Sequence, residues 1–106
     1  MLAGDDPYLF PMTLMGAPGA IAASANLYTR RFVTMIEHGL AGEVTPGRAL
    51  AEALLPLVRA LFAEPSPAVI KALLHAEGRI PTADVRMPLS NASATAVKHA
   101  LAVRPV

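Results

Sequence analysis

The chain has 106 residues, of which 54% are hydrophobic and 16% are charged, and its formal net charge is +1. Typical domains are about 45–50% apolar and about 25% charged, so this chain carries an excess of apolar residues. The near-neutral charge excludes the electrostatic footprint of a nucleic-acid-binding or anionic-membrane-binding protein, and the lack of cysteine excludes thiol catalysis, disulfides and zinc–thiolate sites.

The N-terminal third of the chain predicts a short helix, a turn and one buried strand. Asp6 and Pro7 are typical of a helix start, with Asp6 as the N-cap, and the helix should end near Met15. Pro11 lies inside this helix and predicts that it is short or bent. The run AIAAS, Ala20–Ser24, follows the turn GAPG and predicts a fully buried parallel strand, although periodicity alone leaves a helix open there.

Four further helices are predicted from apolar periodicity and from capping residues. Their expected ranges are Tyr28–Leu40, Thr45–Phe62, Ser66–Gly78 and Ser93–Val103. Thr45 is expected to cap the longest of them, and Pro56 in its middle predicts a kink. The segment Arg79–Ser90, with the sequence RIPTADVRMPLS, predicts an extended connector.

The apolar face of the helix expected over Tyr28–Leu40 is defined by four residues at helical spacing. They are Phe32, Met35, Ile36 and Leu40. We expect this face to pack against the rest of the protein.

A single predicted strand is an anomaly in an otherwise helical chain. Its backbone N–H and C=O groups cannot stay unpaired in a core. Either Ala20–Ser24 is not a strand, or its neighbours are supplied by residues outside this chain.

Four segments, taken together and in order, resemble a known enzyme family. They are LAGDD, MGAPGAIAASAN, LLPLVRALFAEPSPAVIKALL and VRMPLS. Their order and spacing are similar to the C-terminal part of the dihydrodipicolinate synthases, which belong to the pyruvate-dependent class I aldolases together with N-acetylneuraminate lyase. The segments EPSPAVIKALL and VRMPLS favour the synthase branch.

The resemblance implies an α/β fold by descent that is mostly α in this chain. Family members are (β/α)8 barrels with a helical C-terminal extension, and such a barrel needs about 250 residues. Residues 1–43 would then be the end of a barrel, with its seventh helix, one clear eighth strand and its eighth helix, and residues 44–106 would be the extension. The lone strand is explained if it belongs to a barrel whose first six β/α units lie outside this chain.

The family reaction, which serves lysine biosynthesis, requires a lysine that forms a Schiff base with pyruvate. The resulting enamine attacks an aldehyde, aspartate semialdehyde in the synthase. The catalytic lysine and tyrosine of the family lie in the part that this chain lacks, and Lys71, Lys98, Tyr8 and Tyr28 do not match them. We therefore expect no catalytic residue here and no activity from the chain alone.

The resemblance assigns three residues to the wall of the pyruvate pocket. Gly4 and Asp5 match a glycine–acid pair at its rim, and Ile21 matches an isoleucine of the eighth strand that contacts pyruvate. Glycine allows close backbone approach, and an apolar neighbour lowers the pKa of a buried lysine by desolvation. For Asp5, a hydrogen bond at the rim and plain turn chemistry both remain open. Ala22 departs from the family because a serine is common there.

No metal or cofactor is expected. His38, His75 and His99 lie on three different predicted helices without the spacing of metal ligands. Asp5 and Asp6 lie where a secretory leader needs positive charge, and no helical run free of charges reaches the roughly 18 residues of a membrane span. We therefore expect a cytoplasmic protein without nucleic-acid or membrane partners.

Two functions from different classes remain open at this point. In the first, the chain is a lyase fragment that binds pyruvate only when the missing barrel segment completes the barrel. In the second, the helices over Thr45–Val103 form an oligomerisation or interaction module without a catalytic role. The high apolar fraction supports burial between chains, so a homo-oligomer is also expected.

Overall fold

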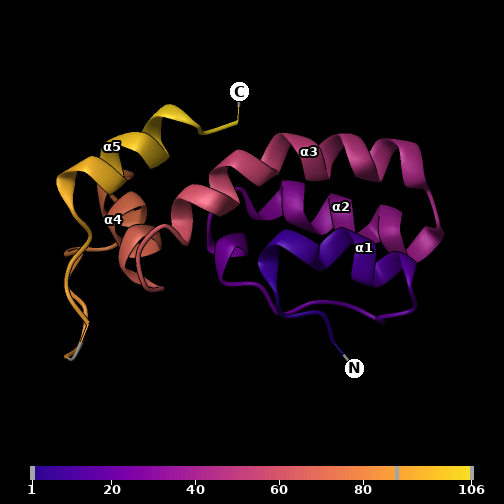
Figure 1. Ribbon diagram of the computed structural model, residues 1–106, viewed down its shortest axis with the longest axis horizontal. Coiled ribbons are helices and arrows are strands. Elements are labelled where there is room, and N and C mark those ends of the chain that lie inside the picture. Colours follow the sequence, from indigo (N-terminus) through magenta and orange to yellow (C-terminus); the bar gives the residue numbers. More distant parts are fainter. Residues whose placement is uncertain (1, 88, 106) are drawn as a thin grey trace. The chain divides into compact units, whose positions relative to one another are not determined.

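The computed structural model describes residues 2–87 and 89–105, so Met1, Val106 and Pro88 of the VRMPLS motif lie outside the described residues. The chain divides into two compact units, Met1–Leu55 and Pro56–Val106. The elements, labelled in Figure 1 where there is room, are η1 (Asp6–Tyr8), α1 (Leu9–Leu14), η2 (Ala23–Asn26), α2 (Thr29–Ala41), α3 (Val44–Leu61), α4 (Ala68–Ala76) and α5 (Ala94–Ala102). The sequence boundary at residues 43 and 44, which separates barrel from extension, stays a prediction.

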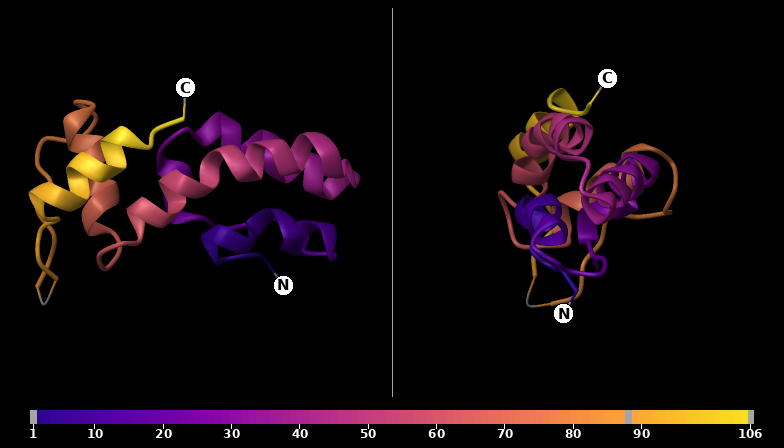
Figure 2. Two further views of the ribbon diagram at one scale, coloured as in Figure 1. Left: turned by 45° about the horizontal axis from the view of Figure 1, so that its top comes forward. Right: turned by 90° about the vertical axis from the view of Figure 1, so that its right-hand side faces the viewer.

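In the first unit, α1 and α2 lie side by side, as Figure 1 and the right-hand view of Figure 2 show. The contact depends on a glycine, because a Cβ atom added at Gly39 would lie 1.9 Å from the Oγ1 atom of Thr13. Thr13 is buried, and its hydroxyl donates a 2.7 Å hydrogen bond to the carbonyl of Phe10. A Cβ atom added at Gly47 of α3 would lie 2.1 Å from the Phe10 ring. Small residues therefore allow the three helices to approach closely around Phe10.

The predicted apolar face of α2 is correct except at its end. Phe32 and Met35 are buried and Ile36 is half-buried, whereas Leu40 is 52% exposed. Helical residues advance by about 100° each, so Leu40 lies about 80° around the helix from Phe32, and Gly39 falls between Phe32 and Met35. Gly39 therefore occupies the packed position that the sequence pattern assigned to Leu40.

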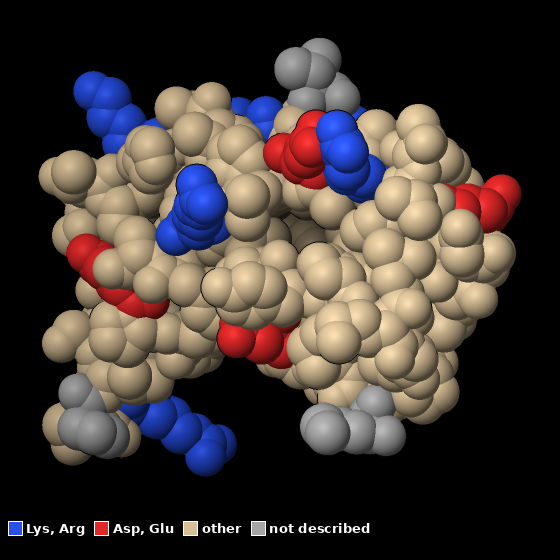
Figure 3. All heavy atoms as spheres, turned by 45° about the vertical axis from the view of Figure 1, so that its right-hand side comes forward, with Lys and Arg blue, Asp and Glu red and all other residues tan. Residues whose placement is uncertain are grey.

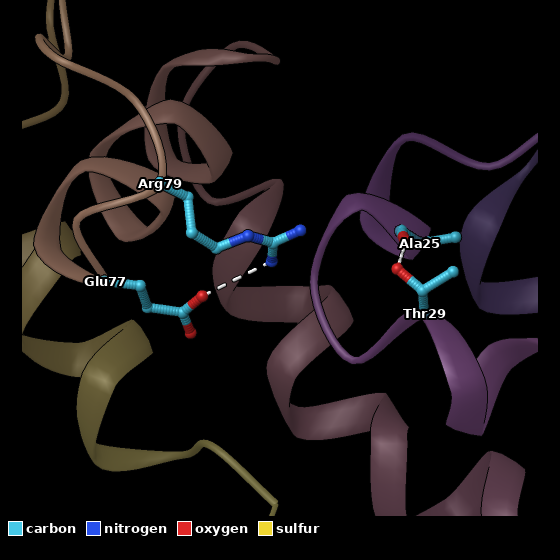
Figure 4. Close-up of polar contacts among 4 residues, drawn as sticks. All are labelled: Ala25, Thr29, Glu77 and Arg79. Carbon is cyan, nitrogen blue, oxygen red and sulfur yellow. Dashed lines mark hydrogen bonds and ion pairs between the residues drawn. The ribbon is translucent and has the colours of Figure 1, made fainter.

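The helix expected over Tyr28–Leu40 is confirmed to within one residue at each end. Tyr28 precedes the helix in the left-handed region, with φ 51°. Gly42 ends the helix in the same region, with φ 74°, as glycine commonly does. Figure 4 shows the Thr29 hydroxyl donating to the carbonyl of Ala25 at 2.5 Å, a bond that ties η2 to the first turn of α2.

The strand predicted over Ala20–Ser24 is wrong for the described residues. Ala20 forms one isolated parallel bridge with Ala3, and the chain turns into η2 at Ala23. The bridge has two hydrogen bonds, from Ala3 N–H to the Gly19 carbonyl at 2.9 Å and from Ile21 N–H to the Ala3 carbonyl at 2.8 Å. A longer ladder needs further paired backbone, and Ser24 N–H instead donates to a side chain.

Two predicted helix caps are also wrong. Asp6 lies inside η1 rather than before it, and Asp5, which occupies the N-cap position, makes no side-chain capping hydrogen bond. The chain from Pro7 to Leu14 is split between η1 and α1, which confirms that this helix is short. Thr45 does not precede α3 because the helix already begins at Val44. Pro56 lies within α3, and the kink expected there stays a prediction.

In the second unit, α4 and α5 pack against each other (Figure 1). Both were predicted, and their ends follow the expected signals: Gly78 has φ 73° just after α4, and the Ser93 hydroxyl accepts the Ala96 N–H at the start of α5. The buried apolar residues of this unit are Leu57, Val58, Ala60, Leu61, Ala68, Val69, Ile70, Ala72, Leu73 and Ala100.

The predicted connector contains no helix or strand in its described part, residues 79–87 and 89–90, but it bends at residues 79–81 and the Leu89 N–H donates to the Arg86 carbonyl at 3.0 Å, so it is not extended throughout. Lys71 of α4 donates to the carbonyl of Asp84 in this connector. Asn91 donates to the Asp84 carboxylate at 3.1 Å and accepts the Val85 N–H at 3.2 Å. Figure 4 shows a surface ion pair between Glu77 and Arg79, with 3.4 Å between nitrogen and oxygen.

Candidate functional site

The parallel bridge brings together two of the three residues assigned to the pocket. Gly4 directly follows Ala3, and Ile21 directly follows Ala20. Because the two segments are parallel, both residues lie at the same, carboxyl end of the pair. A Cβ atom added at Gly4 would be 4.0 Å from the Ile21 carbonyl oxygen, so the two backbones are neighbours there.

Ile21 is 70% exposed, although it lies between half-buried alanines. Ala20 and Ala22 line an apolar groove of about 200 Å³, and Ile21 does not. In extended backbone, successive side chains point to opposite sides, and Ala22 has extended angles. Ile21 therefore presents its side chain on the side away from the groove, while its two neighbours face the helices.

The apolar groove lies among α1, the bridge segment, η2 and α2. Its lining residues are Leu9, Ala20, Ala22, Ala25, Phe32, Val33, Ile36 and Glu37. Gly4, Asp5 and Ile21 are not among them. The groove and the three predicted pocket residues are therefore different surfaces of the first unit.

Asp5 is exposed and has an extended backbone, with φ −104° and ψ 104°. Its carbonyl accepts the Tyr8 N–H at 2.8 Å, which closes the turn into η1. The backbone of Asp5 thus has a turn role, and a role of its side chain toward a ligand stays a prediction.

Asp6 is the residue of this region that sequence reasoning misplaced. Its side chain is buried, at 7% exposure, and its Oδ2 atom accepts the backbone N–H of Ser24 at 2.8 Å. Ser24 is fully buried, and its hydroxyl has no hydrogen-bond partner. The two residues are 18 positions apart, so no local sequence signal could have paired them.

The remaining candidate side chains lie elsewhere. Lys71 is on α4 and Lys98 is on α5, where Lys98 is exposed. His38 contacts the Glu43 carboxylate at 3.1 Å, and His75 contacts the Ile80 carbonyl at 3.3 Å. Among residues 2–87 and 89–105, no group of three or more histidine or acidic side chains could hold a metal ion.

Charged side chains are scattered over the face shown in Figure 3, where one acidic group touches a basic group near the top of the view and the others stand apart among uncharged residues. This matches the small net charge of the chain. Within the part of the chain that the structure describes, the helices are too short or too polar to cross a membrane.

The comparisons with known proteins all point to one enzyme family. Residues 1–103 match the model of the dihydrodipicolinate synthetase family. The chain is 33% identical over 93 residues to the 4-hydroxy-tetrahydrodipicolinate synthase of Methanocaldococcus jannaschii, covering 88% of this chain and 32% of that protein.

Solved structures agree with this match. The crystal structure of dihydrodipicolinate synthase from Thermotoga maritima is similar with a TM-score of 0.90 and 29% identity, covering 96% of this chain and 34% of that one. The chloride-inhibited enzyme from Acinetobacter baumannii, complexed with pyruvate, is similar with a TM-score of 0.86 and 27% identity, covering 94% and 35%. The chain thus spans about a third of the length of the relatives it matches.

Proposed function

Because the chain belongs to the dihydrodipicolinate synthetase family, we propose that it forms one wall of a pyruvate-binding lyase site. In this proposal Gly4, Asp5 and Ile21 line the pocket, and residues outside this chain supply the rest of the barrel and the Schiff-base lysine. The reaction is the condensation of pyruvate with an aldehyde such as aspartate semialdehyde, a step of lysine biosynthesis.

The observation that carries the proposal is that Gly4 and Ile21 lie next to each other at the carboxyl end of the parallel bridge between Ala3 and Ala20. Active sites of (β/α)8 barrels lie at the carboxyl ends of their strands. Ile21 has the further property that the site needs, since its exposed side chain points away from the groove among the helices. The similar Acinetobacter baumannii structure is a complex with pyruvate.

The three residues have separate physical roles in this proposal. Gly4 leaves room for a ligand to approach the backbone. The side chain of Ile21 excludes water from the Schiff base and lowers the pKa of the lysine that forms it. Asp5, exposed at the start of η1, offers a carboxylate that can accept a hydrogen bond from a substrate.

The alternative function, a helical interaction module, is not favoured. The family match runs over residues 1–103 and so includes both units, rather than the C-terminal helices alone. We keep as proposals that the chain assembles with a barrel segment, that it forms homo-oligomers and that it resides in the cytoplasm.

The proposal is tested by co-expressing this chain with the first two-thirds of the Methanocaldococcus jannaschii relative and adding pyruvate with borohydride. We expect a complex in which the reduced adduct lies on the added segment and not on Lys71 or Lys98. An Ile21→Asp variant should assemble equally but give less adduct at limiting pyruvate. An adduct on Lys71 or Lys98, or equal labelling with Ile21→Asp, would contradict the proposal.

A further inference from the structure

We infer that Asp6 is a positioning residue that holds Ile21 in place, an inference that deepens the proposed function and rests on it. Backbone pairing between the two segments is limited to the bridge between Ala3 and Ala20. Beyond this bridge, the Asp6 carboxylate accepts the backbone N–H of Ser24 and so connects the same two segments through a side chain.

Three hydrogen bonds connect the segment around Ile21 to the N-terminal segment. Two are backbone bonds of the bridge, at Gly19 and at Ile21 itself. The third is the bond from Ser24 N–H to the Asp6 carboxylate. Ile21 makes the second of these bonds with its own N–H, and the third lies three residues further along the chain, so Asp6 anchors the chain on the carboxyl side of Ile21, which the bridge does not reach.

The side chain of Ile21 cannot hold the segment by itself because 70% of its surface is exposed. Asp6 and Ser24 are buried, at 7% and 0% exposure, so their bond is shielded from water. A hydrogen bond to a charged acceptor contributes more than one between neutral groups, and loss of the acceptor leaves a buried N–H without a partner. The hydrogen bond between Asp6 and Ser24 should therefore stabilise this segment more than the packing of the exposed Ile21 side chain does.

The side of η2 that faces α2 is held by a different hydrogen bond. The Thr29 hydroxyl bonds the Ala25 carbonyl, and Ser24 N–H bonds Asp6, so η2 is tied at one end to α2 and at the other to η1. Loss of Asp6 should release only the Asp6 side of the turn. The expected effect is local to residues 21–24.

The first experiment measures amide hydrogen exchange by NMR on the full 106-residue chain. In Asp6→Ala, exchange at Ser24 and Ile21 should be at least about tenfold faster, while exchange at Phe32 and Met35 in α2 should change by less than about twofold. Asp6→Asn keeps an oxygen acceptor but loses its charge, so exchange at Ser24 and Ile21 in this variant should lie between that of Asp6→Ala and that of the unchanged chain. Ser24→Ala is the matched control, since it removes a hydroxyl without a partner and leaves the N–H bond intact.

Uniformly faster exchange through α2 would show a merely structural role and overturn the inference, as would unchanged exchange at Ile21. If Asp6→Ala does not fold, the comparison of Asp6→Asn with Ser24→Ala decides, and equal exchange at Ile21 in these two variants and in the unchanged chain overturns the inference.

The second experiment links the anchor to the pocket. In the co-expressed complex, Asp6→Asn should raise the pyruvate concentration needed for half-maximal borohydride trapping, with the same maximal adduct, and Ser24→Ala should not. If no variant is trapped, the proposed function fails while the exchange result still stands or falls by itself. If Asp6→Asn is trapped like the unchanged chain, the anchor has no effect on the pocket and this inference is wrong.

Discussion

The carboxylate of Glu64 binds both polar groups of Ser93, a residue 29 positions later in the chain. One oxygen accepts the Ser93 backbone N–H at 2.9 Å, and the other accepts the hydroxyl at 2.7 Å. The same hydroxyl accepts the Ala96 N–H and so caps α5. Glu64 thus holds the residue at which the last helix begins.

These bonds predict an acid-sensitive start of α5. The bonds from the Ser93 hydroxyl and then from its N–H lower the pKa of Glu64 below its ordinary value of 4.5, and desolvation opposes them. A lowered pKa adds stability that is present above 4.5 and is lost as the pH falls through the lowered value. The protection of the Ala96 and Val97 amides, measured as their exchange rate relative to the intrinsic rate at each pH, should therefore fall below pH 4.5, and by less in Glu64→Gln. Glu52→Gln, which changes an exposed surface pair, is the control.

Gly39→Ala should destabilise the first unit, although alanine favours helices. The helix propensity of alanine exceeds that of glycine by about 1 kcal/mol, but overpacking typically costs about 1–3 kcal/mol. The added methyl would lie 1.9 Å from the Thr13 hydroxyl oxygen. Amide exchange in α2 measures the loss, and a Thr13→Ala double variant should recover part of it. A Gly39→Ala chain more stable than the original would show that helix propensity dominates.

At position 28 we expect a glycine variant to be more stable than an alanine variant, which is the reverse of their usual order of stability in helices. Its backbone is left-handed, with φ 51°, and its ring lies 5.3 Å from the Arg31 guanidinium carbon. Tyr28→Ala and Tyr28→Gly both lose the ring, but only glycine adopts this conformation without strain. The glycine variant should be more stable by about 1 kcal/mol in denaturant unfolding. Equal stability would show that the turn relaxes to negative φ.

Ile21 and Leu9 should respond very differently to truncation. Ile21 is 70% exposed and Leu9 is 1% exposed. Ile21→Ala should change the free energy of unfolding by less than about 0.5 kcal/mol, whereas Leu9→Ala should cost about 2–5 kcal/mol. The comparison uses the chain without any partner. A large cost at Ile21 would mean that its side chain supports the fold and would weaken its assignment to a ligand pocket.

The sequence by itself determined the family and most helices of this chain. Apolar spacing and terminal signals such as Gly78 and Ser93 predicted α2, α4 and α5 to within two residues at each end. Such signals act between residues within a few positions of each other, so they can be read from the chain alone. The ordered motifs identified the family without any structure.

Only the tertiary structure decided where the N-terminal segments meet. The predicted strand is a single bridge in the structure. The Asp6 carboxylate accepts the Ser24 N–H instead of capping a helix. Gly39, rather than Leu40, occupies the packed position on α2. Each outcome depends on a neighbour that is distant in sequence. Each of these features depends on a partner group: a strand needs a paired backbone, a buried carboxylate needs a hydrogen-bond donor, and a close helix contact needs a small residue opposite it. Local periodicity contains no information about these partners.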